Sequence, residues 1–480
     1  MTQFHLPSRL ISVSAISAIC ASLAACAAGP DYAAPSMALP ASYQHAVPMP
    51  IEQSPAPLDI WWEGFHDPQL TRIVQRVQAQ NLDLELAMAR VQQARATAHL
   101  ADANLMPKGE LGLQVAGQRQ SLESPIGEIA SDFPGYRRTE TLFDSGVGAS
   151  WEIDLSGGLH RAREAAVADA EATEADRLAV KVMVQADAAD AYFRVREAQA
   201  RMALARDQIN TDAALLDLIN LRLKEGMDTR REQAEAQARL AQVRASVPPL
   251  QHELDTQLSR LDILMGAIPG TYAAELQHEA KQGGYAQPAL GGALKPQDLL
   301  RRRPDVIAAE RRLAASNARI GVAMSEYYPK LSLSGIVGFE GLDTASMNSN
   351  TFQPAILAGL HWRLFDFGRV DAEVAQAKGK NAEALIRYRS AMLHATEDVE
   401  NALSLQTTLA VERRELQTEV EADQRARGAA EDAYKGGVTG MAELLEQDRQ
   451  LLACRDQLAM AEAGSVRATV AAFRALGGGW

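Results

Sequence analysis

Two pairs of glutamates stand at equal distances behind two helix-breaking glycines. The glycines are Gly226 and Gly437, and the residues six and nine positions later are Glu232 with Glu235, and Glu443 with Glu446. Residues three apart on a helix share one face, so each pair would present two carboxylates together. Such groups repel one another and attract cations, and a hard divalent ion accepts several carboxylate oxygens. A solvated acidic face is the alternative interpretation.

Cys26 is the second residue with distinctive chemistry. It follows a positive residue, Arg9, an apolar run over 10–23 and the small residues Ala24 and Ala25, as in a secretory signal. The site resembles a bacterial lipoprotein box, which predicts a signal peptide over 1–25 and a lipid on the Cys26 thiol. A plain signal peptide with an incidental cysteine is the alternative. Cys454 then remains alone on a helix, without the spacing of a disulfide framework or a metal site.

The sequence lacks the motifs that are typical of catalysis and of cofactor binding. The chain offers no Ser/His/Asp set and no paired Cys or His ligands, and the glycines at 291–292 lack the spacing of a phosphate-binding loop. Its net charge of −13 argues against a nucleic-acid partner. We therefore expect no enzyme, and no cofactor other than the covalent lipid on Cys26.

The glutamate pairs belong to two long helical hairpins. No Gly or Pro occurs from Leu159 to Glu225, which predicts a helix over 157–225, about 100 Å long at about 1.5 Å per residue. A helix of that length must pack as a coiled coil. Gly226 ends it, and a return helix is expected over 228–265. The second hairpin is expected over 368–435 and 439–476.

The two hairpins are copies of one another. Trp151 and Trp362 are 211 positions apart, and so are Gly226 and Gly437, whereas the upstream prolines Pro107 and Pro329 are 222 apart. The sequence thus divides into a first repeat over 69–266 and a second over 295–476. The helical lengths are kept, and the first repeat carries extra residues between its strands.

Each repeat also predicts two strands before its long helix. Apolar and polar residues alternate in four segments, at about 108–123, 140–156, 330–341 and 355–366. This is the weak signature of membrane β-barrel strands, although a soluble sheet with one wet face gives the same pattern. Four strands cannot close a barrel. Two copies would give eight strands and little lumen and three would give twelve and a pore, so a homotrimer is favoured.

The remaining segments connect these elements. A proline-rich extended arm is expected over 26–68, a linker over 267–294 and a short tail over 477–480. The residues Gln69–Met106 read as one helical region that Pro107 ends. The pattern of the first return helix breaks at Pro248–Pro249.

Several motifs together resemble the outer membrane factors of tripartite efflux systems, in the NodT/OprM-like lipoprotein branch of the TolC superfamily. They are CAAGPDY from Cys26, WWEGFHDPQL from Trp61, NLDLELAMARVQQARA from Asn81, RRRPD from Arg301, YYPKLSLSG from Tyr327 and YKGG from Tyr434. The resemblance implies an α+β, TolC-like fold: a trimeric 12-stranded transmembrane β-barrel, continuous with a periplasmic α-helical barrel and an equatorial domain. The implied function is a passive outer-membrane exit duct for small molecules such as drugs and toxic compounds. Its implied partners are outer-membrane lipid, a periplasmic membrane-fusion adaptor and an inner-membrane pump.

The resemblance also assigns roles to residues. Glu443 and Glu446, with Glu232 and Glu235, would form a periplasmic constriction that a hydrogen bond between Tyr434 and Glu232 holds shut. The tip turns that contact the adaptor would be at Gly226, Met227, Gly437 and Val438, and Trp151 and Trp362 would be interfacial aromatics. The family often has Arg or Asp where this chain has Thr439, so the resemblance does not extend to a second clamp there.

Two other functions remain open at this point. The chain could be a TolC-like exit channel that secretes a protein, although the lipoprotein box and the RRRPD motif favour efflux. It could also be a coiled-coil structural lipoprotein, which would need no barrel strands. The sequence does not identify the substrate, the pump or the adaptor family.

Overall fold

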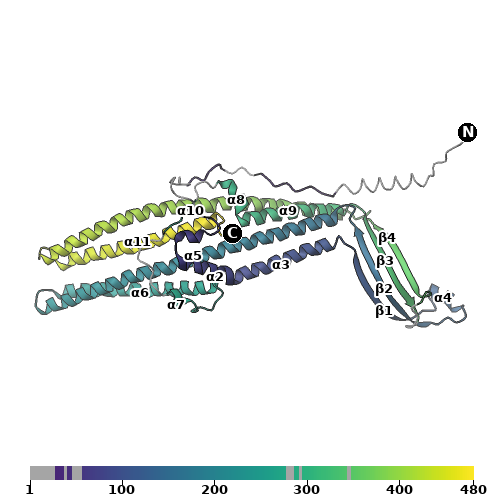
Figure 1. Ribbon diagram of the computed structural model, residues 1–480, viewed down its shortest axis with the longest axis horizontal. Helices are drawn as coiled ribbons and strands as arrows, with labels where there is room; N and C mark the ends of the chain where they lie inside the picture. The colour runs from purple at the N-terminus through teal and green to yellow at the C-terminus, as the bar shows by residue number, and fades with distance from the viewer. Residues whose placement is uncertain (1–26, 37–39, 46–56, 277–285, 291–294, 343–347) are drawn as a thin grey trace. The chain divides into compact units, whose positions relative to one another are not determined.

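The computed structural model describes residues 27–36, 40–45, 57–276, 286–290, 295–342 and 348–480 (Figure 1). The chain folds as two compact units, each assembled from distant segments. The strand unit comprises Met1–Pro35, Gln92–Ala172 and Glu310–Arg387, and the helical unit comprises Ser36–Val91, Thr173–Ala309 and Tyr388–Trp480. None of the helices in the described ranges combines the length and the apolar character needed to cross a membrane.

The strand unit contains one antiparallel sheet in which the strands follow their sequence order. The strands are β1 (Lys108–Arg119), β2 (Thr139–Ile153), β3 (Lys330–Gly341) and β4 (Phe352–His361). The central pair, β2 and β3, joins the two repeats and sets Trp151 opposite Leu333. β1 and β4 are therefore the two edges of the sheet in this chain.

Apolar side chains along the two edge strands are exposed to solvent in the single chain. Leu111, Leu113 and Val115 alternate along β1 and are 71%, 75% and 66% exposed, and Ile356 on β4 is 86% exposed. Successive side chains of a strand point to opposite faces, so these three β1 residues share one face. The single chain therefore leaves both an apolar surface and two strand edges without cover.

Three strands end earlier than the alternating pattern predicts. β1 ends at Arg119 rather than 123, and its connection to β2 contains the short helix α4 (Pro125–Ser131). β2 ends at Ile153 rather than 156, before a turn in which Gly157 has a φ of 74°. β4 covers 352–361 rather than 355–366, because Phe367 and Gly368 adopt positive φ and start the next helix. Apolar alternation continues through these turns, which is why it overestimated the strands.

The helical region before β1 is two helices rather than one. α2 (Pro68–Gln80) and α3 (Leu82–Ala103) meet at Asn81, whose backbone is extended. The Asn81 amide donates to the Leu264 carbonyl at 2.9 Å, and its side-chain oxygen accepts from the Leu84 N–H at 3.1 Å. A buried asparagine that caps one helix and contacts another explains the break, which composition alone did not indicate.

Two helical hairpins of matched length are the largest elements of the fold. α5 (Gly158–Lys224) and α10 (Arg369–Lys435) each contain 67 residues. The return helices α6 (Arg230–Leu264) and α11 (Met441–Ala475) each contain 35 residues. In the helical unit, α6 runs back along α5 and α11 runs back along α10 (Figure 1). Equal lengths in both repeats agree with a duplication.

The expected break at Pro248–Pro249 is absent, because α6 is continuous through both prolines. Each proline removes one backbone N–H donor from the helix. Both prolines are exposed, whereas Val243 on one side of them and Leu258 and Leu261 on the other are buried. Tertiary packing on both sides thus outweighs the local loss of two hydrogen bonds.

The main core of the helical unit gathers aromatic rings from both ends of the chain. The short 3-10 helix η1 (Trp61–Phe65) places Trp61 on Phe473 of α11, with ring centroids 5.5 Å apart and planes 11° apart. Phe65 lies against Phe193 of α5 at 5.0 Å. The C-terminal tail closes this core, since the Gly479 N–H donates to the Leu58 carbonyl at 2.7 Å.

Three further helices, α7, α8 and α9, complete the set that the structure describes. α7 (Ala273–Leu276) falls in the expected linker 267–294, of which 277–285 and 291–294 lie outside the described residues. α8 (Pro296–Arg302) and α9 (Pro304–Ser325) are separated at Arg303. Arg303 forms ion pairs with Asp305 at 2.6 Å and with Asp398 at 2.8 Å, and so ties the start of α9 to α10. The arginine next to Pro304 is therefore structural.

Candidate functional site

The two hairpin turns have the same geometry. Gly226 and Gly437 have φ values of 72° and 71°, in the left-handed region that glycine adopts without strain. The N–H of Met227 donates to the Arg222 carbonyl at 2.8 Å, and that of Val438 donates to the Ala433 carbonyl at 2.9 Å. These bonds close the last turn of each long helix. Met227 and Val438 are 62% and 81% exposed, so both turns present an apolar side chain outward.

Behind the turns, the two hairpins share a small hydrophobic cluster, called the tip core here. Every one of the four long helices contributes to it. Its buried members are Ile219, Ala236, Ala430, Met441, Leu444 and Leu445. Ile219 and Met441 are 0% and 2% exposed, so the hairpins pack tightly at this point. The tip core holds the first hairpin against the second.

Tyr434, at the edge of the tip core, contacts an arginine of the other hairpin. The Arg222 guanidinium donates to the Tyr434 hydroxyl and lies over its ring, 5.2 Å from the centroid. Arg222 also lies 3.4 Å from Asp228, whose side chain is 7% exposed. Burial raises the pKa of Tyr434, so the phenol is neutral at physiological pH. Arg222 thus joins the turn of its own hairpin to the α10 helix.

The expected partner of Tyr434, Glu232, is engaged elsewhere. Its carboxylate accepts from the backbone N–H and the hydroxyl of Thr229, at 2.7 and 2.9 Å. The Thr229 hydroxyl in turn accepts from the Glu232 N–H, which completes a capping box at the start of α6. These hydrogen bonds lower the pKa of Glu232. Within the described residues Arg222 is thus the hydrogen-bond partner of Tyr434 while Glu232 caps its own helix, and the bond between Tyr434 and Glu232 stays a prediction.

The other three tip glutamates are exposed in the single chain. Glu446 forms an ion pair with Arg449, which lowers its pKa, and Glu235 lies 3.6 Å from Arg231. Glu443 stands in the first turn of α11 and has no ion-pair partner among the described residues. Of the predicted carboxylates, Glu443 therefore keeps the least compensated charge.

A stronger contact between the hairpins involves Arg239, which the sequence did not single out. Its Nε donates to both oxygens of Asp212 at 3.0 Å, and its Nη1 donates to the Leu445 carbonyl of α11. The side chains of Arg239 and Asp212 are 10% and 1% exposed. The second hairpin has a comparable pair, with Arg427 and Asp448 2.9 Å apart, in which Asp448 is buried and the Arg427 side chain is 31% exposed.

The repeat could not reveal these two pairs. The position 211 residues after Arg239 is Gln450, and the position 211 residues before Arg427 is Leu216. The arginine therefore stands on the return helix of the first hairpin and on the long helix of the second. Charge patterning within each hairpin was the only signal, and charged residues are too common in coiled coils for it to select these four.

Comparison with known proteins assigns the chain to a family. The family model described as "Outer membrane efflux protein" matches residues 73–267 and 295–478. The chain belongs to the outer membrane efflux protein family. The predicted recognition and the TolC-like α+β fold are thereby confirmed.

Individual relatives extend over nearly the whole chain. The pyoverdine export outer membrane protein OpmQ of Pseudomonas putida is 32% identical over 448 residues, which cover 92% of this chain and 93% of OpmQ. Nodulation protein T of Rhizobium leguminosarum bv. trifolii is 28% identical and covers 92% and 91%. The solved outer-membrane channel OprN superposes with a TM-score of 0.85 at 32% identity, over 95% of this chain and 100% of that chain.

Membership of the outer membrane efflux protein family fixes the broad function. The chain is an outer-membrane exit duct of the kind used by tripartite efflux pumps, and it extends into the periplasm. The family consists of channels rather than enzymes. The coiled-coil structural lipoprotein is set aside, because that alternative predicted no paired strands.

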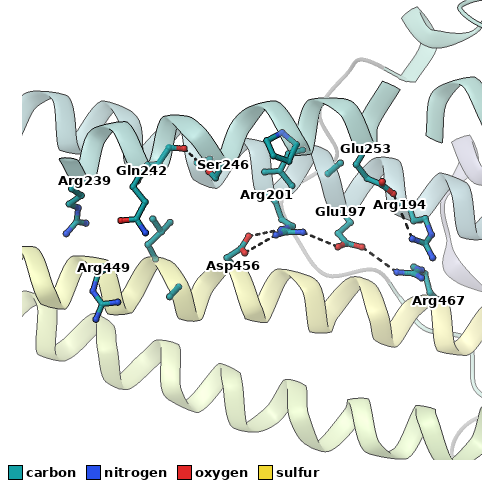
Figure 2. A pocket seen from close by; sticks show the side chains of 17 residues that line it. Arg194, Glu197, Arg201, Arg239, Gln242, Ser246, Glu253, Arg449, Asp456 and Arg467 are labelled. Carbon is teal, nitrogen blue, oxygen red and sulfur yellow. Dashed lines mark hydrogen bonds and ion pairs between the residues drawn. The ribbon is translucent and has the colours of Figure 1, made fainter. Parts of the chain in front are cut away.

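A groove of about 720 Å³ separates α11 of this efflux protein from α5 and α6 (Figure 2). Arg201 of α5 forms a two-point ion pair with Asp456 of α11, at 2.7 and 3.0 Å. Arg467 of α11 lies 3.6 Å from Glu197 of α5, whose pKa is raised by burial. Both arginines are already paired with carboxylates. These ion pairs cross the groove and hold α11 against α5.

The two expected interfacial tryptophans form equivalent contacts in the two repeats. The Trp151 indole donates to the Leu105 carbonyl at 2.9 Å, and the Trp362 indole donates to the Tyr327 carbonyl at 3.0 Å. They are 38% and 50% exposed. Each tryptophan thus fixes the end of the second strand of its repeat to the helix that precedes the first strand.

The expected lipid attachment site, Cys26, lies outside the described residues, as does the signal peptide 1–25. The residues that follow it are firmly held. The Ala28 N–H donates to the Ser156 carbonyl at 2.9 Å, and its carbonyl accepts from Arg161 at 3.1 Å. Arg161 also pairs with Asp31 at 2.7 Å. The start of the arm is therefore bound where β2 gives way to α5.

Proposed function

We propose that three copies of the chain assemble into one passive duct. Each would contribute four strands to a 12-stranded transmembrane β-barrel, below which the hairpins would line a periplasmic α-helical barrel. The observation that carries this proposal is the sheet itself, whose edges β1 and β4 and apolar face are uncovered in one chain. In lipid, open strand edges are not tolerated, so neighbouring copies must pair with them.

Assembly is the experiment that tests this proposal. The full-length protein in detergent is expected to be a trimer by light scattering and to form channels in planar lipid bilayers. Both results follow from closing the barrel, because a conducting lumen needs more strands than one chain supplies. A monodisperse monomer, or a trimer that never conducts, would contradict the duct.

The transported molecules are proposed to be small molecules delivered by an inner-membrane pump through a periplasmic adaptor. The export of pyoverdine by OpmQ, as that relative is named, supports a small solute over a secreted protein. The adaptor would contact the turns at Gly226 and Gly437. The exposed Met227 and Val438 support this assignment, because they offer apolar contacts at the end of each hairpin.

We further propose that the tip glutamates narrow and charge the periplasmic entrance. Three chains would bring six carboxylates together from Glu443 and Glu446, and Glu232 and Glu235 would add to the negative potential. Arg449 offsets part of this charge at Glu446. Within a Debye length of about 8 Å, such charges concentrate cations.

The charge of the entrance can be tested by neutralising it. Glu443→Gln with Glu446→Gln should lower cation selectivity and weaken block by divalent ions, with little change in trimer stability. Single-channel reversal potentials in a salt gradient measure this. Glu412→Gln, which removes one exposed carboxylate of α10, serves as the control. Equal selectivity in the double variant and the control would identify a solvated outer face.

Cys26 is proposed to carry the lipid that anchors the arm to the outer membrane. The hydrogen bond that holds Ala28 to Ser156, just after β2, supports this, because Cys26 stands only two positions before Ala28 in the sequence. Cys26→Ser should accumulate as an uncleaved or unacylated, mislocalised form, which membrane fractionation and intact mass would reveal. A wild-type mature mass without lipid would refute the anchor.

A further inference from the structure

Three side chains that commonly bind metals meet between α10 and α11, apart from the residues proposed for the entrance. Glu419 and Asp423 stand one turn apart on α10, and Cys454 faces them from α11. One ligand atom from each lies within 4.8 Å of the other two. Cys454 is 2% exposed and packs with Val420 and Leu451, whereas Glu419 is exposed to solvent. The cysteine that the sequence left alone thus has two carboxylates beside it.

The cluster is not satisfied by the protein itself. The Oδ2 atom of Asp423 is buried and has no hydrogen-bond partner among the described residues. A buried polar atom without a partner carries a free-energy penalty. The Cys454 thiol reaches only the Leu416 carbonyl, at 3.9 Å, and a weak contact with Glu419. Burial and the two carboxylates raise the pKa of this thiol to about 11.

The corresponding place in the first hairpin shows what usually fills this position. The residues 211 positions earlier are Gln208, Asp212 and Val243. There the aspartate is bound by Arg239 at 3.0 Å and by the Gln208 amide at 2.7 Å. In the second hairpin the arginine is replaced by Gln450, the glutamine by Glu419 and the valine by Cys454. Compared with the first hairpin, the second lacks the protein cation and has one more carboxylate and a thiol.

We propose that Glu419, Asp423 and Cys454 bind one borderline-soft divalent cation such as Zn²⁺, which ties α10 to α11. Zinc accepts cysteine sulfur and carboxylate oxygen together, and three protein ligands with a water in the fourth position are common. Tetrahedral bonds of about 2.0–2.3 Å require ligand atoms about 3.5 Å apart, so rotamer shifts of these side chains must bring them closer. The exposed side of Glu419 admits the water. Binding releases the thiol proton, because the thiolate is the ligand.

The alternative is that Cys454 is only a small apolar residue of the coiled-coil core, with two solvated acids nearby. That alternative explains the burial of the thiol. It does not explain why the second hairpin lacks the arginine and has a second carboxylate at the same place. The proposed site is independent of the duct, since either could be refuted without the other.

The experiment titrates the purified, reduced full-length protein in detergent with Cd²⁺, a zinc-like probe whose bond to thiolate absorbs in the ultraviolet. One ion per chain should give the absorption band, and excess Zn²⁺ should displace it. Cys454→Ser should abolish the band. Glu419→Gln with Asp423→Asn, which keeps the thiol, should weaken Cd²⁺ binding at least about tenfold. Glu421→Gln, a nearby exposed carboxylate of α10, is the matched control and should bind like the wild type.

The outcomes separate the two interpretations. Absence of the band in wild-type protein overturns the site, as does a band that persists in Cys454→Ser. Equal affinity in the carboxylate double variant and in Glu421→Gln overturns the role of the acids. Circular dichroism of each variant before titration shows that it is folded, so a lost band reports the ligand set.

Discussion

Replacing Arg239 with alanine is expected to loosen the two hairpins and raise the conductance of the duct. The substitution removes the contact with the Leu445 carbonyl and leaves Asp212, with 1% of its side chain exposed, as a buried charge whose arginine is gone. Breaking such a buried pair costs about 3–5 kcal/mol. At the tip, the tip core and the contact between Arg222 and Tyr434 then remain to hold the first hairpin against the second.

Single-channel recording and the susceptibility of cells to a large antibiotic such as vancomycin measure the effect. Arg244→Ala is the matched control, since it removes an exposed arginine from the same helix. The double variant Arg239→Met with Asp212→Leu distinguishes an effect on folding stability from an effect on closure of the duct. Its two apolar side chains can pack against each other, but the hydrogen bond from Arg239 to the Leu445 carbonyl of α11 stays lost. This double variant should be stable and still leaky. Wild-type conductance in Arg239→Ala would assign closure to the tip core.

Replacing Trp61 with alanine is expected to cost about 3–5 kcal/mol of folding free energy, as for large aromatic residues in cores. Trp61 is 1% exposed, stacks on Phe473 and makes edge contacts with Trp62 and Phe65. Its removal would leave a cavity between η1, α5 and α11. The denaturation midpoint and the rate of proteolysis of the purified protein should both show the loss.

Trp480→Ala is the matched control for this prediction. That indole is 39% exposed and donates only to the Arg302 carbonyl, at 3.1 Å. A net hydrogen bond is worth about 1 kcal/mol, so the control should shift the midpoint much less. Similar shifts in both variants would mean that the aromatic core is not the main support of the helical unit.

The long helices and their turns could be predicted from short stretches of sequence. α5 follows from a stretch without glycine or proline, α10 follows as its repeat although it contains Gly379 and Gly428, and the turns follow from Gly226 and Gly437. Their ends lie close to the expected residues because one glycine with positive φ ends a helix whatever its surroundings. The alternation of apolar and polar residues predicted the four strands, and the family motifs then supplied the function.

The errors occur where a distant contact decides the conformation. Asn81 breaks a helix because its amide reaches Leu264, and Pro248–Pro249 do not break one because their neighbours are packed on both sides. Likewise the motifs did not indicate that Glu232 caps its own helix or that Arg222 contacts Tyr434. The role of Arg239 could not be predicted, because its partners, Asp212 and the Leu445 carbonyl, come from two other helices.

The hydrogen bonds of Trp151 to Leu105 and of Trp362 to Tyr327 divide each repeat into two parts. The segment before the tryptophan differs in length between the repeats, and the segment after it does not. From Leu105 to Tyr327 is 222 positions, but from Trp151 to Trp362 is 211, so the difference between repeats arises wholly within the first strand pair and its connection. The long helices of the hairpins that follow these tryptophans have the same number of residues in both repeats. For protein engineering, the β1–β2 connection is thus the natural place to graft a peptide for surface display. A graft in α5 or α10 would shift one tip against the other.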